Sequence, residues 1–162
     1  MGAKGRKARK SLADNAPSPP YKVDMTATAE AVYKSLYHQA KAAEQRGNYT
    51  SAHITTFDMV RDAIKRTIPS DPLNRKYALR GQLSNIFRLK KGRMRICWIA
   101  SSKMRRICLL FISETLRKEG DANDPYVILQ NMIDSGTFDA IFTQFGVRMP
   151  KLRGQSPTEK PH

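Results

Sequence analysis

The segment NIFRLKKGRMRICWIASSKMRRICLLFISE, residues 85–114, decides the fold because the spacing of hydrophobic residues changes there. Before it, hydrophobic residues recur every three or four positions. Within it, they alternate with polar residues or run continuously, as in β-strands. A glycine at position 92 and the small polar stretch SSKM, residues 101–104, divide the segment. The pattern therefore predicts three consecutive strands that are joined by two short turns and pair antiparallel.

The first turn sets which side chains share a face of the sheet. If Lys91 and Gly92 are its two central residues, Lys90 pairs with Arg93 and Arg88 pairs with Arg95. One face of this hairpin then carries these four cations, and we call it the cationic face. The opposite face is hydrophobic and consists of Phe87, Leu89, Met94, Ile96 and Trp98.

The second turn extends the hydrophobic face on to the third strand. With SSKM as the loop, the expected pairs are Trp98 with Ile107, Ile96 with Leu109, and Met94 with Phe111. The same register places Cys97 opposite Cys108. These are the two cysteines of the chain, and their spacing forms no CxxC motif. We therefore expect two reduced, buried thiols rather than a disulfide framework or a zinc site.

Two amphipathic helices precede these strands. YKVDMT, residues 21–26, alternates and predicts a short first strand. Residues 27–46 show helical spacing that Gly47 ends, and a second helical stripe runs from Ile54 to Ile68 with Pro69 as its terminator. Helices this close in sequence predict an antiparallel hairpin, which is expected to cover the hydrophobic face of the sheet. The cationic face is then expected to point outward.

Shorter elements and two tails complete the chain. A helix is expected to begin at Pro125, with Asp124 as its cap, and FDAIFTQFG, residues 138–146, predicts a last short helix. Residues 1–20 and 150–162 are expected to be disordered because they offer almost nothing to a core. The sequence thus predicts an α+β domain over residues 21–149. It contains an antiparallel sheet of about four strands, the N-terminal two-helix hairpin and one or two short C-terminal helices.

The charge of the chain favours an anionic partner. Its 162 residues include 29 Lys and Arg against 14 Asp and Glu, which gives a net charge of +15. Nucleic acid, an acidic protein and a membrane surface are the partners that such a balance attracts. No hydrophobic run approaches the roughly 18 residues of a spanning helix, and the N-terminus has no signal peptide. We therefore expect a cytoplasmic protein that does not associate with membranes.

The cations are concentrated where the strands are. Between Pro72 and Ser113 there are eleven Lys or Arg and no Asp or Glu. Crowded cations repel one another, and a solvated strand face normally carries both signs. We interpret the cationic face as a phosphate-binding surface for RNA or DNA, because the planar fork of arginine matches phosphate oxygens. An ordinary solvated surface and a site for an acidic protein are the alternatives.

Several motifs resemble a known family. The order of strand, two helices and three strands, with LSNIFRLKKGRMRICW on the middle strands, resembles the RelE/ParE superfamily of bacterial toxins. The stretches GRMRICW, SSK, ETLRKEGDANDPY and DPYVILQNMI are most similar to its YhaV branch of messenger-RNA interferases, over roughly residues 27–137. ETLRKEGDANDPY is the most specific of them, whereas a basic strand pair occurs in many RNA-binding sheets.

This resemblance implies a RelE-like fold and an endoribonuclease toxin that cleaves messenger RNA, often on translating ribosomes. It also implies a cognate antitoxin that holds the toxin inactive. In YhaV systems this antitoxin is usually a PrlF-like protein of the swapped-hairpin (AbrB/MazE) type. The resemblance implies neither a cofactor nor a metal ion.

The resemblance also implies roles for individual residues. Arg95 is similar to the arginine that stabilises the transition-state phosphate, and Arg88 with Lys90 matches the cationic pair of the preceding strand. Arg117 matches the arginine after the last core strand, and Tyr126 matches an aromatic or hydroxyl position beyond it. Arg88 stands where the best-studied relatives have lysine, and the loops around Arg117 and Tyr126 differ in length from theirs.

The chemistry of RNA cleavage suits these residue types. The 2′-hydroxyl attacks the neighbouring phosphate, so the enzyme must deprotonate that hydroxyl, stabilise a dianion and protonate the leaving 5′-oxygen. Clustered cations stabilise the dianion. Lys90 is a candidate base because neighbouring cations favour its neutral form, and Glu114 is either the alternative base or an ion-pair partner of Arg117. Three roles are open for Tyr126: it stacks on an RNA base, it donates a proton, or it only packs at the start of the helix that is expected from Pro125. The further cations expected to contact RNA are Arg80, Lys91, Arg93 and Lys118.

Two other functions fit the same pattern. A non-catalytic RNA- or DNA-binding module would use the cations only to hold phosphates, and its binding would be tight and salt-sensitive. A ParE-like protein would inhibit DNA gyrase through protein contacts, and its cationic strand face would be dispensable. ParE-like members generally lack the full set of Arg88, Lys90 and Arg95, which favours the ribonuclease.

Overall fold

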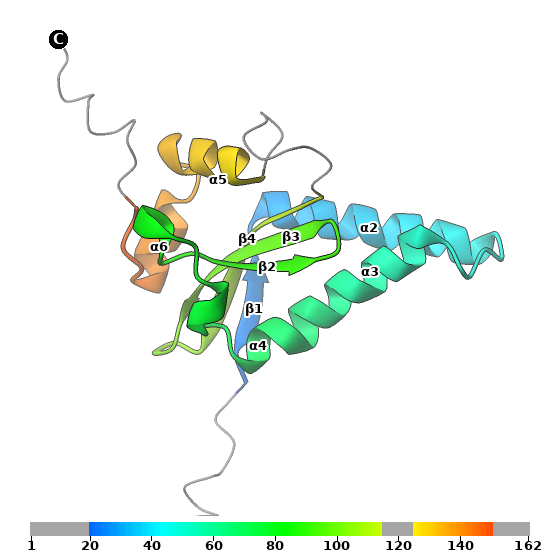
Figure 1. Cartoon of the computed structure of the whole chain (residues 1–162), viewed down its shortest axis with the longest axis horizontal. Helices are drawn as coiled ribbons and strands as arrows, with labels where there is room; N and C mark the ends of the chain where they lie inside the picture. The colour runs from blue at the N-terminus through cyan, green and yellow to red at the C-terminus, as the bar shows by residue number, and fades with distance from the viewer. Residues whose placement is uncertain (1–19, 115–124, 151–162) are drawn as a thin grey trace, which may run out of the picture.

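A computed structural model of the chain describes residues 20–114 and 125–150 (Figure 1). The two tails predicted at 1–20 and 150–162 thus lie outside the described residues, apart from residues 20 and 150. In chain order the elements are β1 (Lys22–Met25), α2 (Ala27–Gln45), α3 (Ala52–Asp62), η1 (Ala63–Thr67), α4 (Ile68–Ser70), η2 (Arg75–Tyr77), η3 (Gly81–Leu83), β2 (Phe87–Lys91), β3 (Met94–Ser101), β4 (Arg106–Glu114), α5 (Pro125–Asp134) and α6 (Asp139–Phe145). The predicted α+β class, the two-helix hairpin and both C-terminal helices are confirmed.

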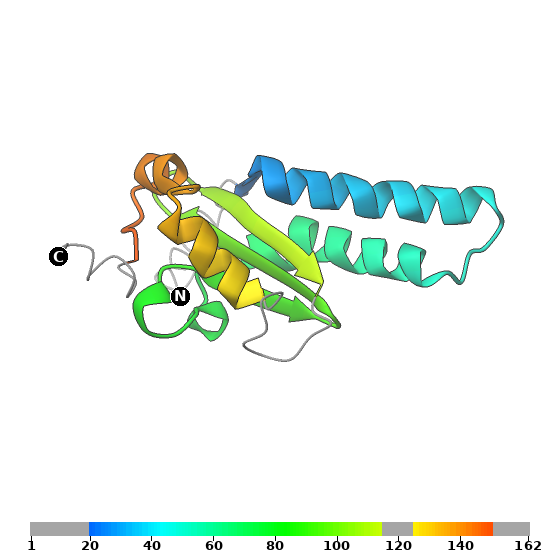
Figure 2. The same cartoon turned by 90° about the horizontal axis from the view of Figure 1, so that it is seen from above.

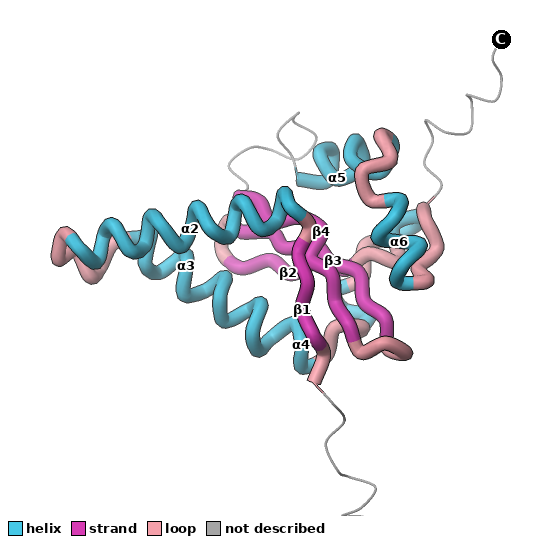
Figure 3. Tube along the Cα trace, turned by 180° about the vertical axis from the view of Figure 1, so that it is seen from behind, coloured by secondary structure: helices cyan, strands magenta, loops and turns pink. Residues whose placement is uncertain are grey.

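The described residues form three layers, with the sheet between two helical layers (Figure 2). Helices α2 and α3 lie against one face, and α5 and α6 lie against the other. Seen from behind, the far ends of α2 and α3 project well past the strands (Figure 3). The sheet therefore buries both of its faces, but the helical hairpin is longer than the sheet that it covers.

The sheet is mixed rather than antiparallel. Its strand order is β1-β4-β3-β2, and β1 runs parallel to β4, while β2 and β4 are each antiparallel to β3. Thr26 links β1 to the first helix, because its hydroxyl accepts a hydrogen bond from the Ala29 N–H and donates one to the Leu110 carbonyl. Asp24 on β1 forms an ion pair with Arg106 on β4. The prediction of a wholly antiparallel sheet was wrong because periodicity identifies a strand but not its direction.

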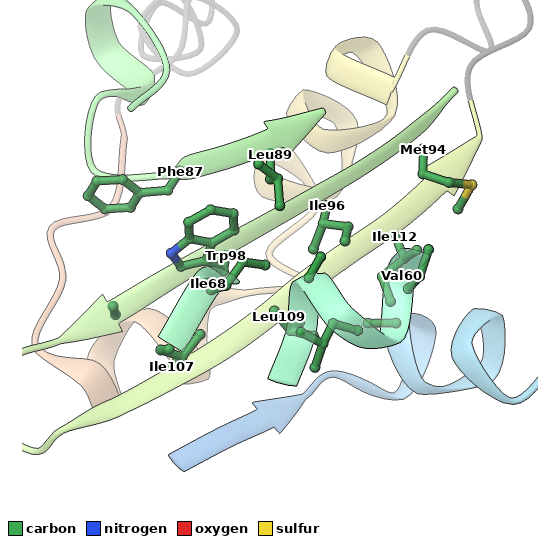
Figure 4. Close-up of a cluster of buried hydrophobic side chains, with 14 residues drawn as sticks. Val60, Ile68, Phe87, Leu89, Met94, Ile96, Trp98, Ile107, Leu109 and Ile112 are labelled. Atoms are coloured by element: carbon green, nitrogen blue, oxygen red, sulfur yellow. The ribbon is translucent and has the colours of Figure 1, made fainter. Parts of the chain in front are cut away.

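The first core lies between the sheet and the helical hairpin (Figure 4). Val60 and Ile68 of the hairpin meet the predicted hydrophobic face, and Trp98 is fully buried among them. The Trp98 indole N–H donates a hydrogen bond of 2.9 Å to the Pro72 carbonyl. This bond fixes the start of the 72–86 connection, which returns the chain to the edge strand β2.

A π-helical turn, η1, continues the second helix of the hairpin. The Ile68 N–H donates to the Ala63 carbonyl five residues earlier, and α4 then carries the helix on to Ser70. Pro69 was predicted to end the helix, which continues for one more residue, to Ser70. Through the wider turn, Ile64 and Ile68 both stay in the first core.

The β2–β3 hairpin turns one residue later than predicted. Gly92 and Arg93 are its central residues, since Lys91 pairs with Met94 and Lys90 pairs with Arg95. Gly92 has a φ of +56°, which favours glycine at the first central position of a two-residue turn. Arg93 therefore lies in the turn and not opposite Lys90, which corrects its predicted place on the cationic face.

The β3–β4 register also differs from the prediction, first because the turn comes one residue later and then because β4 contains a β-bulge. Trp98 pairs with Leu109, but Cys97 pairs with Phe111, so Leu110 is the extra residue. Because the turn is shifted, Cys108 pairs with Ile99 and not with Cys97, although both thiols are buried and unpaired as predicted. The turn itself occupies residues 102–105, and Arg105 takes a φ of +54° in it.

The second core covers most of the face that was predicted to point outward. Bulged β4 turns both Leu110 and Phe111 toward this side, where Leu129 of α5 and Phe142 of α6 cover them. Apolar residues on that face need cover, which the prediction had overlooked. Only the end of the face near the β2–β3 turn keeps its cations outside this core. Within the described ranges, none of the helices is both long and apolar enough to span a bilayer.

Candidate active site

Three of the predicted cations share one face of the β2–β3 hairpin. Lys90 pairs directly with Arg95, and Arg88, two residues before Lys90 on β2, pairs with Cys97. Side chains two apart on a strand point to the same face, so Arg88, Lys90 and Arg95 stand together. Lys90 is exposed, whereas Arg88 and Arg95 are half-buried. We refer to these three residues as the cationic triad.

Arg95 is positioned by the turn beside it. Its Nη1 donates hydrogen bonds to the Gly92 carbonyl at 2.9 Å and to the Met94 carbonyl at 3.0 Å. The guanidinium is planar and has five N–H donors, so these two bonds orient it and leave other donors for a ligand. A lysine at this position has no such fork.

Arg88 is positioned by an aromatic ring. Its guanidinium carbon lies 5.4 Å from the centre of the Tyr126 ring, in the first turn of α5. Burial raises the pKa of the Tyr126 hydroxyl, while the Arg88 charge acts in the opposite direction. Among the residues that the structure describes, the Arg88 Nε is buried without a hydrogen-bond partner. A buried guanidinium nitrogen without an acceptor is costly and marks a place where a ligand atom would stabilise the protein.

A cavity of about 460 Å³ opens beside Arg88 and Tyr126. The connection before β2 forms one wall of it, and α5 forms the other. Arg80, predicted to contact RNA, lies on its lining and is exposed. The complete lining is Ala78, Leu79, Arg80, Leu83, Arg88, Tyr126 and Gln130.

Several other residues predicted for the site do not lie on the face of the cationic triad. Glu114 pairs with Met94, so its side chain is on the opposite face of the sheet from Arg95. Lys91 also pairs with Met94 and faces away from the cationic triad. Arg93 is exposed in the turn. Arg117 and Lys118 lie outside the described residues, and both histidines of the hairpin, His38 and His53, are exposed on α2 and α3.

Two residues at the site were missed by sequence reasoning. Cys97 pairs with Arg88 and lies two residues after Arg95 on β3, and burial raises the pKa of its thiol to about 12 although both arginines act to lower it. Gln130 lines the cavity one helical turn after Tyr126. Its i, i+4 spacing from Tyr126 was the available signal, because residues four apart on a helix share a face.

The family comparison decides which class of protein carries this site. Residues 23–147 match the model of a family described as a toxin with endonuclease activity, of a toxin–antitoxin system. The chain belongs to the YhaV toxin family. The predicted family is thus confirmed, and so is an enzyme of the endonuclease class.

Solved structures similar to this YhaV-family chain include toxins and a toxin–antitoxin complex. The isolated E. coli RelE toxin is 13% identical; the match covers 70% of this chain and 98% of that one, with a TM-score of 0.45. The RelBE2 complex from Mycobacterium tuberculosis matches at 19% identity over 60% of this chain and 94% of that one, with a TM-score of 0.42. The YoeB/ParE toxin from Agrobacterium tumefaciens is 15% identical; the match covers 59% of this chain and 99% of that one, with a TM-score of 0.42. No curated protein sequence matches the chain significantly.

Proposed function

We propose that this YhaV-family toxin is an endoribonuclease that cleaves messenger RNA in the cytoplasm at the cationic triad. The observation that carries the proposal is the grouping of Arg88, Lys90 and Arg95 on one face, beside the ring of Tyr126. Three cations suit a phosphate, and an adjacent aromatic ring suits a base. An acidic protein would need the cations but not the ring.

In the proposed reaction, the 2′-oxygen forms a bond with the adjacent phosphorus while the bond from phosphorus to the 5′-oxygen breaks. Lys90 accepts the proton of the 2′-hydroxyl. Arg88 and Arg95 donate hydrogen bonds to the nonbridging oxygens as negative charge develops on them. The products are a 2′,3′-cyclic phosphate and a 5′-hydroxyl, and no further reactant is consumed.

The leaving 5′-oxygen needs a proton, which we assign to Tyr126. Burial raises the pKa of this hydroxyl, so it stays protonated at neutral pH and can act as a donor. The resemblance adds Arg117 as a further phosphate contact. Glu114 has no part in this proposal, because the residue with which it pairs, Met94, faces the first core.

The proposal includes two partners. The family comes from toxin–antitoxin systems, and we propose a PrlF-like antitoxin as the cognate inhibitor. We also propose that cleavage takes place on translating ribosomes. The net charge of +15 supports this, because ribosomal RNA is a dense array of phosphates that attracts a basic protein.

The decisive experiment is expression of the full chain in bacteria, followed by mapping of the 5′ ends of cellular RNA. We expect growth arrest and new 5′-hydroxyl ends in messenger RNA, both lost with Arg95→Ala. Lys65→Ala is the matched control, because Lys65 is an exposed cation on η1 in the opposite helical layer. It should behave as wild type.

Each rival function has its own signature in the same experiment. A non-catalytic binding module would leave messenger RNA intact while the purified protein still binds RNA in a salt-sensitive way. A gyrase inhibitor would leave messenger RNA intact and cause gyrase-dependent DNA damage. If the wild-type protein is expressed and messenger RNA stays intact, the ribonuclease proposal is overturned, whichever rival function then applies.

A further inference from the structure

We propose that the cavity between the 78–83 connection and α5 holds one nucleobase of the RNA, and that Gln130 determines which base is preferred. This inference rests on the proposed function, because it adds a specificity pocket to the same cleavage site. It adds residues beyond the cationic triad, and the proposed reaction does not use Gln130.

The walls of the cavity suit a flat aromatic ligand. Leu79 and Leu83 supply apolar contact on one side, and the Tyr126 ring supplies an aromatic surface on the other. Proteins that recognise single-stranded RNA take up unstacked bases in this way, on aromatic rings and with hydrogen bonds to the base edges. The volume of about 460 Å³ lies within the range of about 300–1,000 Å³ that is usual for small-ligand pockets.

The cavity and the cationic triad share one residue, so they can bind one nucleotide between them. Arg88 belongs to the triad and also lines the cavity, and its buried Nε lacks an acceptor among the described residues. A base carbonyl or a phosphate oxygen at this place would supply that acceptor. Arg80 adds a second cation to the lining, and a cation there suits the sugar–phosphate chain that carries the base.

Gln130 supplies the group that can tell bases apart. Its side-chain amide has both donors and an acceptor, so it matches a base edge that presents a donor next to an acceptor. Gln130 is exposed on α5, and the hydrogen bonds found for the described residues include none from its amide. The side chain is therefore available to a ligand.

The test uses four 2′-O-methylated trinucleotides, each made of a single base, which bind but cannot be cleaved. Their dissociation constants are measured with the full-length wild type and with Gln130→Leu and Gln130→Glu. We expect a base preference in the wild type that falls by roughly 5- to 150-fold in Gln130→Leu, the range of one bidentate base contact. Gln130→Glu should shift the preference away from uracil, because adenine, guanine and cytosine each have an amino group that donates to a carboxylate and uracil has none.

The control is Asn131→Leu, the neighbouring exposed residue on α5, which is not on the cavity lining. It should keep the wild-type preference. Equal preference in the wild type and in Gln130→Leu would overturn the inference, as would a wild type that binds none of the four trinucleotides. A wild type that shows the Gln130-dependent preference but cleaves no RNA would keep the pocket and overturn the proposed ribonuclease.

Discussion

Lys90 lies directly opposite Arg95 across the β2–β3 ladder, and neither belongs to the ion pairs found in the described residues. Like charges that face each other across a ladder destabilise a sheet. The fold tolerates this pair, which is what a site for an anion requires. A phosphate bound between the two side chains would remove the repulsion.

The first prediction separates stability from activity at this pair. Lys90→Gln keeps most of the side-chain length and removes one charge, so the free energy of unfolding should rise by about 0.2–1 kcal/mol. RNA cleavage should slow by about 100- to 10,000-fold because the proposed base is lost. Urea denaturation and single-turnover cleavage measure the two effects. A variant that is less stable than wild type would contradict the repulsion argument.

A second prediction concerns the orientation of Arg95. Arg95→Lys keeps the charge but loses the planar fork that bonds to the Gly92 and Met94 carbonyls. Cleavage should slow by about 100- to 1,000-fold, as for the loss of one preorganised donor. RNA affinity should change much less, since the charge remains. Rates within threefold of wild type would show that charge alone is sufficient at this position.

The third prediction divides the two uses of Tyr126. Tyr126→Phe removes the hydroxyl and keeps the ring, so cleavage should slow by about 100-fold while trinucleotide binding is retained. Tyr126→Ala should lose both. Because burial raises the pKa of this hydroxyl, its protonated form persists above pH 10, and the wild-type rate should show no decline from this group at lower pH. If Tyr126→Phe cleaves RNA as fast as wild type, another group must donate the proton to the leaving 5′-oxygen.

The two buried thiols predict how stability depends on pH. Burial raises the pKa of Cys97 to about 12 and that of Cys108 to about 11, above the ordinary value of 9.0. The unfolded chain therefore releases these protons first as pH rises. The stability that the neutral thiols contribute is complete below pH 9 and is lost as pH rises through the folded-state values. The urea midpoint should fall between pH 9 and 11, and by less when both cysteines are replaced by alanine.

The last prediction concerns metal ions and salt. The positive charge at the site comes from side chains, so cleavage should persist in excess EDTA. Binding of single-stranded RNA should weaken with salt at a slope of about −2 in a double-logarithmic plot, as expected for three phosphate contacts. Replacing any one cation of the triad should make the slope shallower by about 0.7. Complete loss of cleavage in EDTA would require a metal ion in the mechanism.

The sequence predicted which side chains of the hairpin share a face, although it placed the turn wrongly. Moving the turn by one residue changes the partner of Lys90 from Arg93 to Arg95, a shift of two. A shift of two leaves every side chain on its face, because strand faces alternate with period two. Arg88, Lys90 and Arg95 therefore stayed together in spite of the error. Of the four residues predicted on the cationic face, only Arg93 is absent from it, because Arg93 lies in the turn.

The bulge in β4 is what could not be predicted from the sequence. Residues 107–112 are all apolar, so no alternation reveals that Leu110 is the extra residue. An insertion of one residue exchanges the faces of everything beyond it. Phe111 consequently joins the second core, and Glu114 moves to the face opposite the cationic triad. The cover of α5 and α6 over the cationic face, and with it the cavity, was missed for a different reason, because apolar residues such as Ile99 and Leu110 on that face were overlooked.

The charges of the helical hairpin are balanced, in contrast to those of the strands. Residues 27–71 hold six Lys or Arg and five Asp or Glu, whereas residues 72–113 hold eleven Lys or Arg and no acid. Four of those five acids form ion pairs with cations of the same hairpin, three or four residues away. The positive charge of the described residues is therefore concentrated at the strands, and the projecting hairpin of α2 and α3 is an arm with almost no net charge (Figure 3). The electric field of a polyanion such as RNA exerts a torque on a molecule with this charge distribution. The protein is therefore turned with its strands toward the polyanion before the first contact is made.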